Sequence, residues 1–428
     1  MGKILVAHAY TQHSFRVVSA LKKQDRLFKY ATSVYNKKNS FWFKLTTFFL
    51  SESNKKRALK KKCESINDDE VVTFCTLLGL IALLLIRIDK SHKIWEKYTY
   101  FFSRIFQKKL ANYILKHKDE IDAVISYDLH SYYLFDILER KAPHIIRIMD
   151  NAHPCRYYLN KVYNEIESGP FYKTLTTEAN GFVINKSVAK HWGDELLKAQ
   201  YHIVASSFSK KAALYDGVKE ENIYVVPYGA NKSVFKKNPN KNYNGILKVL
   251  FVGSIHQRKG IYNLLEAAKN INKNEHRVDF NLVGVGFAGY PDLYNPYRKY
   301  VNYLGYVSFE KLVDLYANSH IFIFPTLGEG YGLVLLEAMS AGLPILASPN
   351  CGAADIIVEN ENGMLLKPGE TSDIIDKINY IDSNRELLKK MSENAEKSTK
   401  CYTWERYEIQ LLSAIEDIYN KHKNINYE

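Results

Sequence analysis

The chain has 428 residues, which is more than one ordinary hydrophobic core accommodates and predicts two domains of roughly 200 residues each. Its net charge of +13 is accompanied by no helix-turn-helix, RNA-binding-sheet or zinc-ligand pattern, which argues against nucleic acid as a partner. Five scattered cysteines without a C-x-x-C pair argue against disulfides and zinc, and the first strand follows the N-terminus without a secretory signal, so we expect a cytoplasmic protein.

Short apolar runs in the N-terminal half alternate with helical stretches, which predicts a parallel sheet covered by helices. The predicted strands are Lys3–His8, Ala123–Tyr127, Ile145–Met149, Gly181–Ile184 and Tyr201–Ala205. A nicotinamide-dependent oxidoreductase would carry G-x-G-x-x-G after its first strand. The segment Leu5–Arg16 has no such motif, which argues against that class.

Two apolar segments interrupt this alternation. The aromatic run Phe41–Leu50 precedes the basic run Lys55–Lys62, and together they predict a patch that contacts an anionic membrane. The alternative is a packed hydrophobic helix beside a solvated basic loop. The uncharged run Val71–Ile86 is shorter than the about 20 residues of a membrane span, so we expect a helix buried in the N-terminal domain or lining the acceptor side of a cleft.

In the C-terminal half, Lys248–Gly260 (KVLFVGSIHQRKG) reads as a strand, a loop with two adjacent cations and the start of a helix over Ile261–Lys269. Arg258 and Lys259 in that loop suit a phosphate clamp, although surface cations are often merely solvated. Val278–Gly286 and Tyr303–Val307 follow as further strand-like runs, the first of them ending in glycines.

The segment Pro325–Gly342 (PTLGEGYGLVLLEAMSAG) contains two glutamates, Glu329 and Glu337, with seven residues between them. It follows the predicted strand Ile321–Phe324, and a helix is predicted from Leu333 until Gly342 and Pro344 end it. Glu329 then lies in the loop and Glu337 on the helix. The helix N-terminus suits a diphosphate, and the two carboxylates suit sugar hydroxyls, whereas the alternative is a helix with solvated acidic residues.

Taken in order, FVGSIHQRKG, NLVGVG, YLGYVS, FPTLGEGYGLVLLEAMSAGLPILAS and NGMLLKPGE resemble the donor-binding domain of family 4 glycosyltransferases of the bacterial surface-polysaccharide type. That family has the GT-B fold, two Rossmann-like α/β domains facing each other across a cleft, and it retains anomeric configuration. The resemblance implies an N-terminal acceptor-side domain over residues 1–235, a donor-binding domain over 236–400 and a C-terminal helix over 401–428 that packs back on the N-terminal domain.

The resemblance also implies roles for individual residues. Arg258 and Lys259 would contact the donor diphosphate in a loop that begins at Gly253, Glu337 would bind the ribose, and Glu329 would face the transferred sugar. Gly332 and Leu333 would offer backbone N–H groups, and Tyr306 with Val307 would lie against the nucleobase. Two positions depart from the family pattern, because Ser254 stands where many members have Arg and Asp355 where they often have Glu.

The N-terminal domain carries the resemblance less well. Its first loop, AHAYTQHS, lacks the glycine pair that family members often have, and His13 or Ser14 would replace part of that role. His153, in RIMDNAHPCRYY, resembles the histidine of the cleft and would touch the donor sugar and the reacting centre. Asp128 and His130 in SYDLHS are further candidates at the edge of the cleft.

The implied reaction is a retaining transfer of a hexosyl or related group from a UDP-, GDP- or other NDP-sugar to an acceptor hydroxyl, in capsule, O-antigen or exopolysaccharide assembly. The departing diphosphate would take the acceptor proton, and no metal or other cofactor is expected. We expect a lipid-linked saccharide as acceptor and peripheral contact with the inner face of an anionic plasma membrane. The alternative is a non-catalytic sugar-nucleotide-binding subunit on the same fold.

Overall fold

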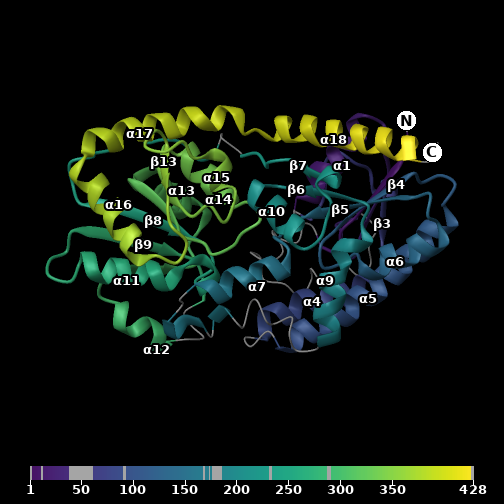
Figure 1. Ribbon diagram of the computed structural model, residues 1–428, viewed down its shortest axis with the longest axis horizontal. Helices are drawn as coiled ribbons and strands as arrows, with labels where there is room; N and C mark the ends of the chain where they lie inside the picture. Colours follow the sequence, from purple (N-terminus) through teal and green to yellow (C-terminus); the bar gives the residue numbers. More distant parts are fainter. Residues whose placement is uncertain are drawn as a thin grey trace.

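The computed structural model describes residues 2–10, 13–37, 61–89, 93–166, 169–172, 174–175, 186–230, 234–286 and 291–425. Two parallel sheets organise these residues, one in each half of the chain (Figure 1). The predicted strand Gly181–Ile184, the aromatic run Phe41–Leu50 and all but the last two residues of Lys55–Lys62 lie outside the described residues.

The N-terminal sheet has seven strands in the order β3-β2-β1-β4-β5-β6-β7. Its strands are β1 (Ile4–Ala7), β2 (Leu27–Thr32), β3 (Val71–Thr73), β4 (Ala123–Tyr127), β5 (Ile146–Asn151), β6 (Tyr201–Val204) and β7 (Ile223–Val225). The order reverses between β1 and β4, which pair in parallel with Ile4 opposite Ala123. Loops that leave the carboxyl ends of two such strands diverge, and ligands of open parallel sheets bind at this point.

The C-terminal sheet repeats the plan with six strands in the order β10-β9-β8-β11-β12-β13. Its strands are β8 (Leu247–Val252), β9 (Val278–Val283), β10 (Asn302–Gly305), β11 (Ile321–Phe324), β12 (Ile345–Ala347) and β13 (Gly363–Leu365). The order reverses between β8 and β11. The loops after these two strands carry Arg258, Lys259 and Glu329, so the strand order itself brings these residues to one place.

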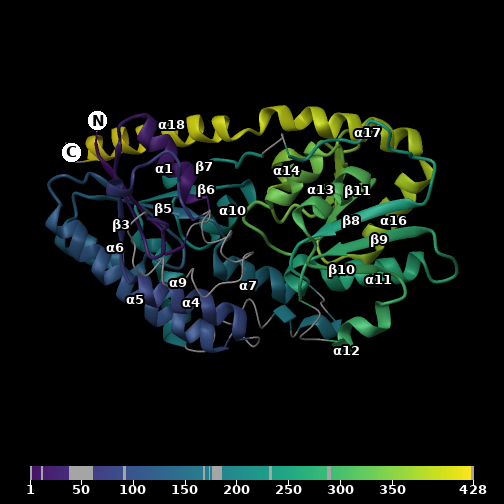
Figure 2. The same cartoon turned by 180° about the vertical axis from the view of Figure 1, so that it is seen from behind.

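Helices cover both sheets, as expected for parallel strands that are buried on both faces (Figures 1 and 2). In the N-terminal half they are α1 (Ser14–Lys23), α4 (Thr76–Ile88), α5 (Lys93–Lys116), α6 (Tyr132–Lys141), α7 (Arg156–Glu165), α9 (Lys186–Lys198) and α10 (Ser207–Tyr215). In the C-terminal half they are α11 (Ile261–Ile271), α12 (Pro291–Tyr294), α13 (Phe309–Asn318), α14 (Leu333–Ser340), α15 (Ala353–Ile356), α16 (Thr371–Ser383) and α17 (Arg385–Ser398).

The last helix, α18 (Trp404–Ile425), leaves the C-terminal half and lies along the N-terminal half, so that both chain ends meet at one end of the molecule (Figure 1). Polar contacts with the N-terminal half hold it there. Lys23 and Arg26 pair with Glu408 and Glu416 at 2.5 and 2.9 Å, and the hydroxyl of Tyr224 donates to a carboxylate of α18 at 2.6 Å. The residue limits of the three predicted units, 1–235, 236–400 and 401–428, stay a prediction.

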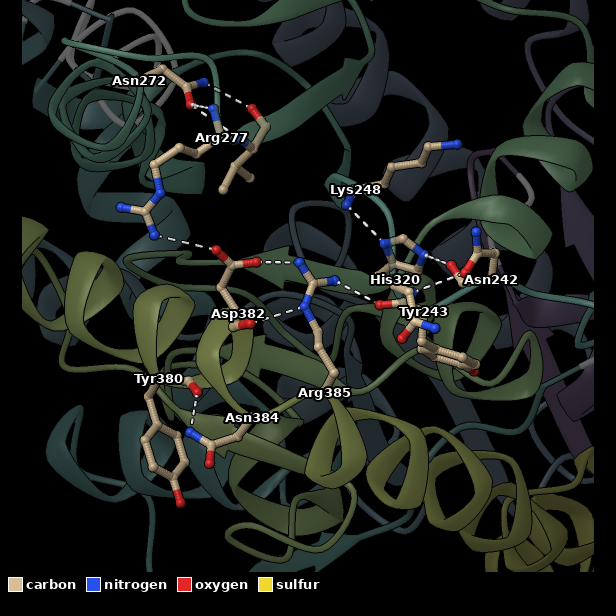
Figure 3. A network of polar contacts seen from close by, with 12 residues as sticks. Asn242, Tyr243, Lys248, Asn272, Arg277, His320, Tyr380, Asp382, Asn384 and Arg385 are labelled. Atoms are coloured by element: carbon tan, nitrogen blue, oxygen red, sulfur yellow. Dashed lines mark hydrogen bonds and ion pairs between the residues drawn. The ribbon is translucent and has the colours of Figure 1, made fainter.

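A polar network ties the connection between the two sheets to the amino-terminal edge of the C-terminal sheet (Figure 3). The backbone N–H of Lys248 donates to His320 Nδ1 at 3.0 Å, so Nε2 carries the proton and donates to the carbonyl of Asn242 at 2.8 Å. Burial lowers the pKa of His320 to about 4. The ring therefore stays neutral, with one nitrogen as donor and the other as acceptor. Arg385 extends the network by donating to the carbonyl of Tyr243 at 3.1 Å.

The run Val71–Ile86 is not the single helix that was predicted to be buried or to line the acceptor side of a cleft. Its first three residues pair with β2 as an edge strand, and a left-handed residue, Cys75 with φ 58°, separates this strand from α4. Helix α4 packs beside α5 but leaves Leu84 and Ile88 exposed. In the part of the chain that the structure describes, no helix is both long enough and apolar enough to cross a membrane.

Candidate functional site

The loop after β8 brings two cations to the carboxyl edge of the C-terminal sheet. It begins at Gly253 and continues through a single 3₁₀ turn, Gln257–Lys259, which Gly260 ends in the left-handed conformation at φ 71°. A Cβ atom on Gly260 would lie 1.9 Å from the carbonyl oxygen of Pro325. Glycine is therefore required where this turn packs against the loop after β11.

Glu329 pairs with both cations of that turn. Its Oε2 accepts a hydrogen bond from the guanidinium of Arg258 at 2.8 Å and a second, short one from the ammonium of Lys259. Lys259 Nζ also lies 4.8 Å from the ring centroid of Phe324, and all three ionised side chains are largely buried. The structure thus brings the residue expected at the sugar into direct contact with the residues expected at the diphosphate.

Backbone contacts fasten the loop that carries Glu329. The N–H of Leu327 donates to the carbonyl of Arg258 at 2.7 Å, and the N–H of Glu329 donates to the carbonyl of Asn350 at 2.9 Å. These bonds fix the loop to the cation turn on one side and to the loop after β12 on the other. The position of the Glu329 carboxylate therefore follows from backbone geometry as well as from its ion pairs.

Helix α14 begins directly after this loop. Gly332 precedes it in the left-handed conformation, with φ 88°, and Leu333 is its first residue. Glu337 lies on the helix, and its carboxylate accepts a hydrogen bond from Tyr316 of α13 at 3.0 Å. Burial raises the pKa of Glu337, and the Tyr316 hydroxyl partly offsets this effect. As predicted, Glu329 lies in the loop and Glu337 lies on the helix.

The residues expected at the nucleobase follow the short edge strand β10, which ends at Gly305, two residues earlier than the predicted run. Tyr306 is 71% exposed, and Val307 packs partly against the core of the C-terminal domain. Tyr306 therefore has a ring surface that a planar base can stack on.

On the N-terminal side, His153 follows β5 and Asp128 follows β4, its neighbour in the sheet. His153 Nδ1 lies 2.7 Å from Asp128 Oδ2, and Asp128 Oδ1 accepts the N–H of Ala152 at 3.0 Å. Burial tends to raise the pKa of Asp128, but the His153 charge and these hydrogen bonds outweigh burial and lower it. Half of the His153 side chain is exposed.

The two halves of the site touch at Gly330, one residue after Glu329. A Cβ atom there would lie 2.0 Å from the carbonyl oxygen of Ala152 and 3.6 Å from the Cα of His153. The hydroxyls of Ser206 and Ser209 donate to the Gly330 carbonyl at 2.6 and 3.0 Å. The loops that carry Glu329 and His153 are therefore in backbone contact, which the sequence could not indicate.

The other candidate site residues, His13, Ser14 and His130, make contacts within the N-terminal domain. His13 Nε2 lies 2.8 Å from Asp150, Ser14 bonds to the hydroxyl of Tyr30 at 2.9 Å, and His130 Nδ1 lies 2.8 Å from the hydroxyl of Ser103. Burial lowers the pKa of His130 to about 4. These pairs give His13, Ser14 and His130 structural partners of their own.

Sequence reasoning missed several residues of this region. In the sequence Asp355 is only a departure from the family pattern, yet its carboxylate accepts the N–H of Ser207 from the N-terminal half at 2.9 Å. Glu195, on α9, accepts hydrogen bonds from two backbone groups of the Asp128 loop. Its local sequence, KHWGDELLK, carries no signal for such a role. Among the described residues, no group of three or more His, Cys, Asp or Glu side chains could hold a metal ion.

Comparison with known proteins finds a family match in the C-terminal half. Residues 232–398 match the family described as glycosyl transferases group 1. This region is therefore similar to the group 1 glycosyltransferases. The match contains every residue placed above at the donor side, from Gly253 to Glu337.

Proteins similar in sequence to this chain include three glycosyltransferases. An uncharacterized glycosyltransferase of Methanocaldococcus jannaschii is 26% identical over 302 residues, 68% of this chain and 75% of the relative. The capsular polysaccharide biosynthesis glycosyltransferase CapM of Staphylococcus aureus is 25% identical over 51% of this chain and 60% of its own length. The O-antigen chain mannosyltransferase B of Escherichia coli is 30% identical over 39% of this chain and 44% of its own length.

Solved structures share the fold over nearly the whole chain. Sucrose-phosphate synthase of Thermosynechococcus elongatus superimposes with a TM-score of 0.65 at 15% identity, covering 98% of this chain and all of that one. The Anabaena protein HepE, solved in complex with UDP-glucose, gives 0.58 at 16% identity over 97% of this chain and all of its own. These matches confirm the predicted GT-B fold. The family match and the relatives, rather than these structures, support the predicted class of enzyme, a glycosyltransferase of EC class 2.4. The relatives belong to different pathways, so the surface-polysaccharide assignment stays a proposal.

Proposed function

We propose that the chain transfers a sugar from a nucleoside-diphosphate donor to an acceptor hydroxyl with retention of configuration. The observation that supports this most directly is the convergence of Arg258, Lys259 and Glu329 at the carboxyl edge of the C-terminal sheet. Two cations beside one carboxylate provide charge for a diphosphate and an acceptor for sugar hydroxyls. Backbone contact at Gly330 brings the His153 loop to the same place.

Each residue takes one role in the proposed reaction. Arg258 and Lys259 neutralise the diphosphate as the bond to the sugar breaks, which is the main electrostatic task of such a transfer. A diphosphate bound there competes with Glu329 for both cations, so the carboxylate becomes available to sugar hydroxyls. His153, oriented by Asp128, faces the sugar from the other domain. Glu337 accepts ribose hydroxyls, and the backbone of Gly332 and Leu333 contributes N–H donors.

The experiment is turnover of nucleotide sugars by Arg258→Ala and Glu329→Ala. A thermal-shift panel of UDP- and GDP-sugars first selects the donor, because a ligand stabilises the fold in proportion to the logarithm of its concentration over its Kd. Each variant should lose at least about tenfold in kcat/KM. Arg277→Ala, which removes a C-terminal-domain surface arginine paired with Asp382 at 3.3 Å, is the matched control. Unchanged turnover by both site variants in folded protein contradicts the proposal.

We further propose an acceptor held at a membrane, a lipid-linked saccharide of surface-polysaccharide assembly, at the cytoplasmic face. The capsular and O-antigen relatives support the assignment to surface-polysaccharide assembly. The proposed contact with a membrane is supported by the surfaces of helices α4 and α5, which lie side by side (Figure 2). Leu77, Leu84 and Ile88 are exposed along one side of α4, and α5 exposes a stripe of apolar and basic side chains. That stripe comprises Ile94, Lys97, Phe101, Arg104 and Lys108.

A different result would favour the non-catalytic alternative. Calorimetry that detects donor binding while no tested acceptor is glycosylated and no donor is hydrolysed would indicate a sugar-nucleotide-binding subunit. The thermal-shift panel uses the same protein preparation, so the two outcomes can be separated on one sample.

A further inference from the structure

Glu195 lies on α9 in the N-terminal domain and is 2% exposed. Its two carboxylate oxygens reach different backbone groups of one loop. Oε2 accepts the N–H of Leu129 at 3.0 Å, and Oε1 accepts the N–H of Ser131 through a short hydrogen bond. Both acceptors of a buried acidic side chain are therefore committed to the loop between β4 and α6.

The loop that Glu195 holds is strained. Leu129 has φ 73°, a left-handed conformation that is unfavourable for a residue with a branched side chain. Such a conformation persists only where neighbouring groups hold it, and strained backbone of this kind gathers at functional sites. Glu195 bonds the residue at the strained position and the residue two positions later, so it holds the loop on both sides of its left-handed turn.

The same loop places the partner of His153. Asp128 immediately precedes Leu129, and its two oxygens accept from His153 Nδ1 at 2.7 Å and from the N–H of Ala152 at 3.0 Å. An unbroken series of contacts thus runs from α9 through the strained turn to the imidazole. Burial raises the pKa of Glu195 to about 8, and the charge of Asp128 adds to this effect. The two backbone N–H groups and the charge of Arg156 oppose it, and both charged residues belong to this cluster.

We propose that Glu195 is a positioning residue for glycosyl transfer, acting through Asp128 on the orientation of His153. This inference rests on the proposed function only in assigning His153 to the reaction. The geometric part, that Glu195 fixes the Asp128–His153 pair, is independent of activity. A buried carboxylate could instead serve folding alone, and the experiment must separate these roles.

Glu195→Gln is the decisive variant because it keeps the size of the side chain. Its amide NH₂ faces one of the two backbone N–H donors, so one hydrogen bond is lost and two donors oppose each other. We expect kcat to fall about ten- to a hundredfold with little change in donor KM, since misplacement of a reacting-centre group acts on the transition state. Glu139→Gln, which alters an exposed ion pair with Lys198 on the same domain, is the matched control.

A double-mutant cycle tests the route of action. If Glu195 acts through Asp128, then Glu195→Gln adds nothing to the loss caused by Asp128→Asn. Leu129→Gly tests the strain, because glycine adopts a positive φ freely and should restore part of the activity lost in Glu195→Gln. Additive losses, or no restoration by the glycine, contradict the proposal and indicate a role in folding alone.

Nitrogen NMR of the His153 ring gives a readout without turnover. In the unaltered protein the Nδ1 and Nε2 shifts should report one fixed tautomer, and in Glu195→Gln they should move toward the averaged values of a free imidazole. Identical shifts in the two proteins overturn the inference. If the shifts move but His153→Ala retains full turnover, the role of His153 in the proposed function fails while the positioning by Glu195 stands.

Discussion

The carboxylate of Glu329 lies 2.8 Å from the guanidinium of Arg258, although 71 residues separate them in the chain. Lys259 bonds to the same oxygen. In the proposed site, the residue expected to face the transferred sugar would therefore compete with a bound diphosphate for the same cations. A change in the charge of Glu329 should therefore alter both nucleotide binding and turnover.

Glu329→Gln should bind free UDP or GDP more tightly while turning over more slowly. Removing the negative charge removes the competitor of the diphosphate, and an ion pair of about 1 kcal/mol corresponds to about fivefold in Kd. Turnover falls because the amide is a poorer acceptor for sugar hydroxyls. Calorimetry with the nucleoside diphosphate measures the first effect, with Glu361→Gln, an exposed glutamate of the same domain, as control. Weaker nucleotide binding by the variant would contradict this account.

Tyr316→Phe should weaken donor binding about fivefold. The Tyr316 hydroxyl donates to Glu337 at 3.0 Å, and without it the carboxylate expected at the ribose loses its orientation, at a cost of about 1 kcal/mol. Isothermal titration with the selected nucleotide sugar measures the change. Tyr243→Phe removes a hydroxyl contact to Ser392 at 2.7 Å elsewhere in this domain and should leave donor affinity unchanged. Equal effects of the two variants would indicate general loosening of the domain.

Gly330→Ala should lower kcat by about tenfold or more in a folded protein. The added methyl group would lie 2.0 Å from the carbonyl oxygen of Ala152, so the Glu329 and His153 loops must move apart. Gly245→Ala is the control, since a Cβ atom there meets nothing within 4 Å. Steady-state kinetics beside thermal denaturation measure both variants. Normal turnover by Gly330→Ala would mean that contact of the loops is not needed.

Acid should destabilise the fold through His202, which is 1% exposed on β6. Burial lowers its pKa from 6.5 to about 3, so between these values the unfolded chain binds a proton that the folded chain does not. Stability therefore falls as pH falls through this window, by at most about 1.4 kcal/mol per pH unit for one proton. Urea unfolding of His202→Gln at several pH values should give a shallower slope, whereas the exposed His276→Gln should not.

Leu84→Ser combined with Ile88→Ser should weaken binding to vesicles by about tenfold or more, because both side chains are exposed on α4 and would enter the lipid interface. Sedimentation with phosphatidylcholine vesicles containing phosphatidylglycerol measures the effect, and neutral vesicles should bind less because the α5 stripe is basic. Ile409→Ser, an equally exposed residue of α18, is the control. Equal binding by all variants would contradict the proposed contact of α4 with a membrane.

The donor half of the site was largely predictable because its signals are local. A β-favouring run, glycines at the turn and a helix stopped by Gly342 and Pro344 act over a few residues, so Glu329 could be placed in a loop and Glu337 on a helix. The same local logic failed at Val71–Thr73, where pairing with Tyr30–Thr32 outweighs the helical tendency of a long apolar run. An edge strand of three residues carries too little pattern to separate it from the helix that follows.

By itself, the sequence determined the alternation that produces two parallel sheets, the order of the donor-site motifs and the positions of Arg258, Lys259, Glu329 and Glu337 within them. Only the tertiary structure decided that Glu329 pairs with both cations, that Asp128 orients His153 and that Glu195 holds the loop between them. Backbone preferences extend over a few residues, whereas these contacts join loops at the reversal points of strand order. Their partners are set by which strands lie side by side, and no single segment carries that information.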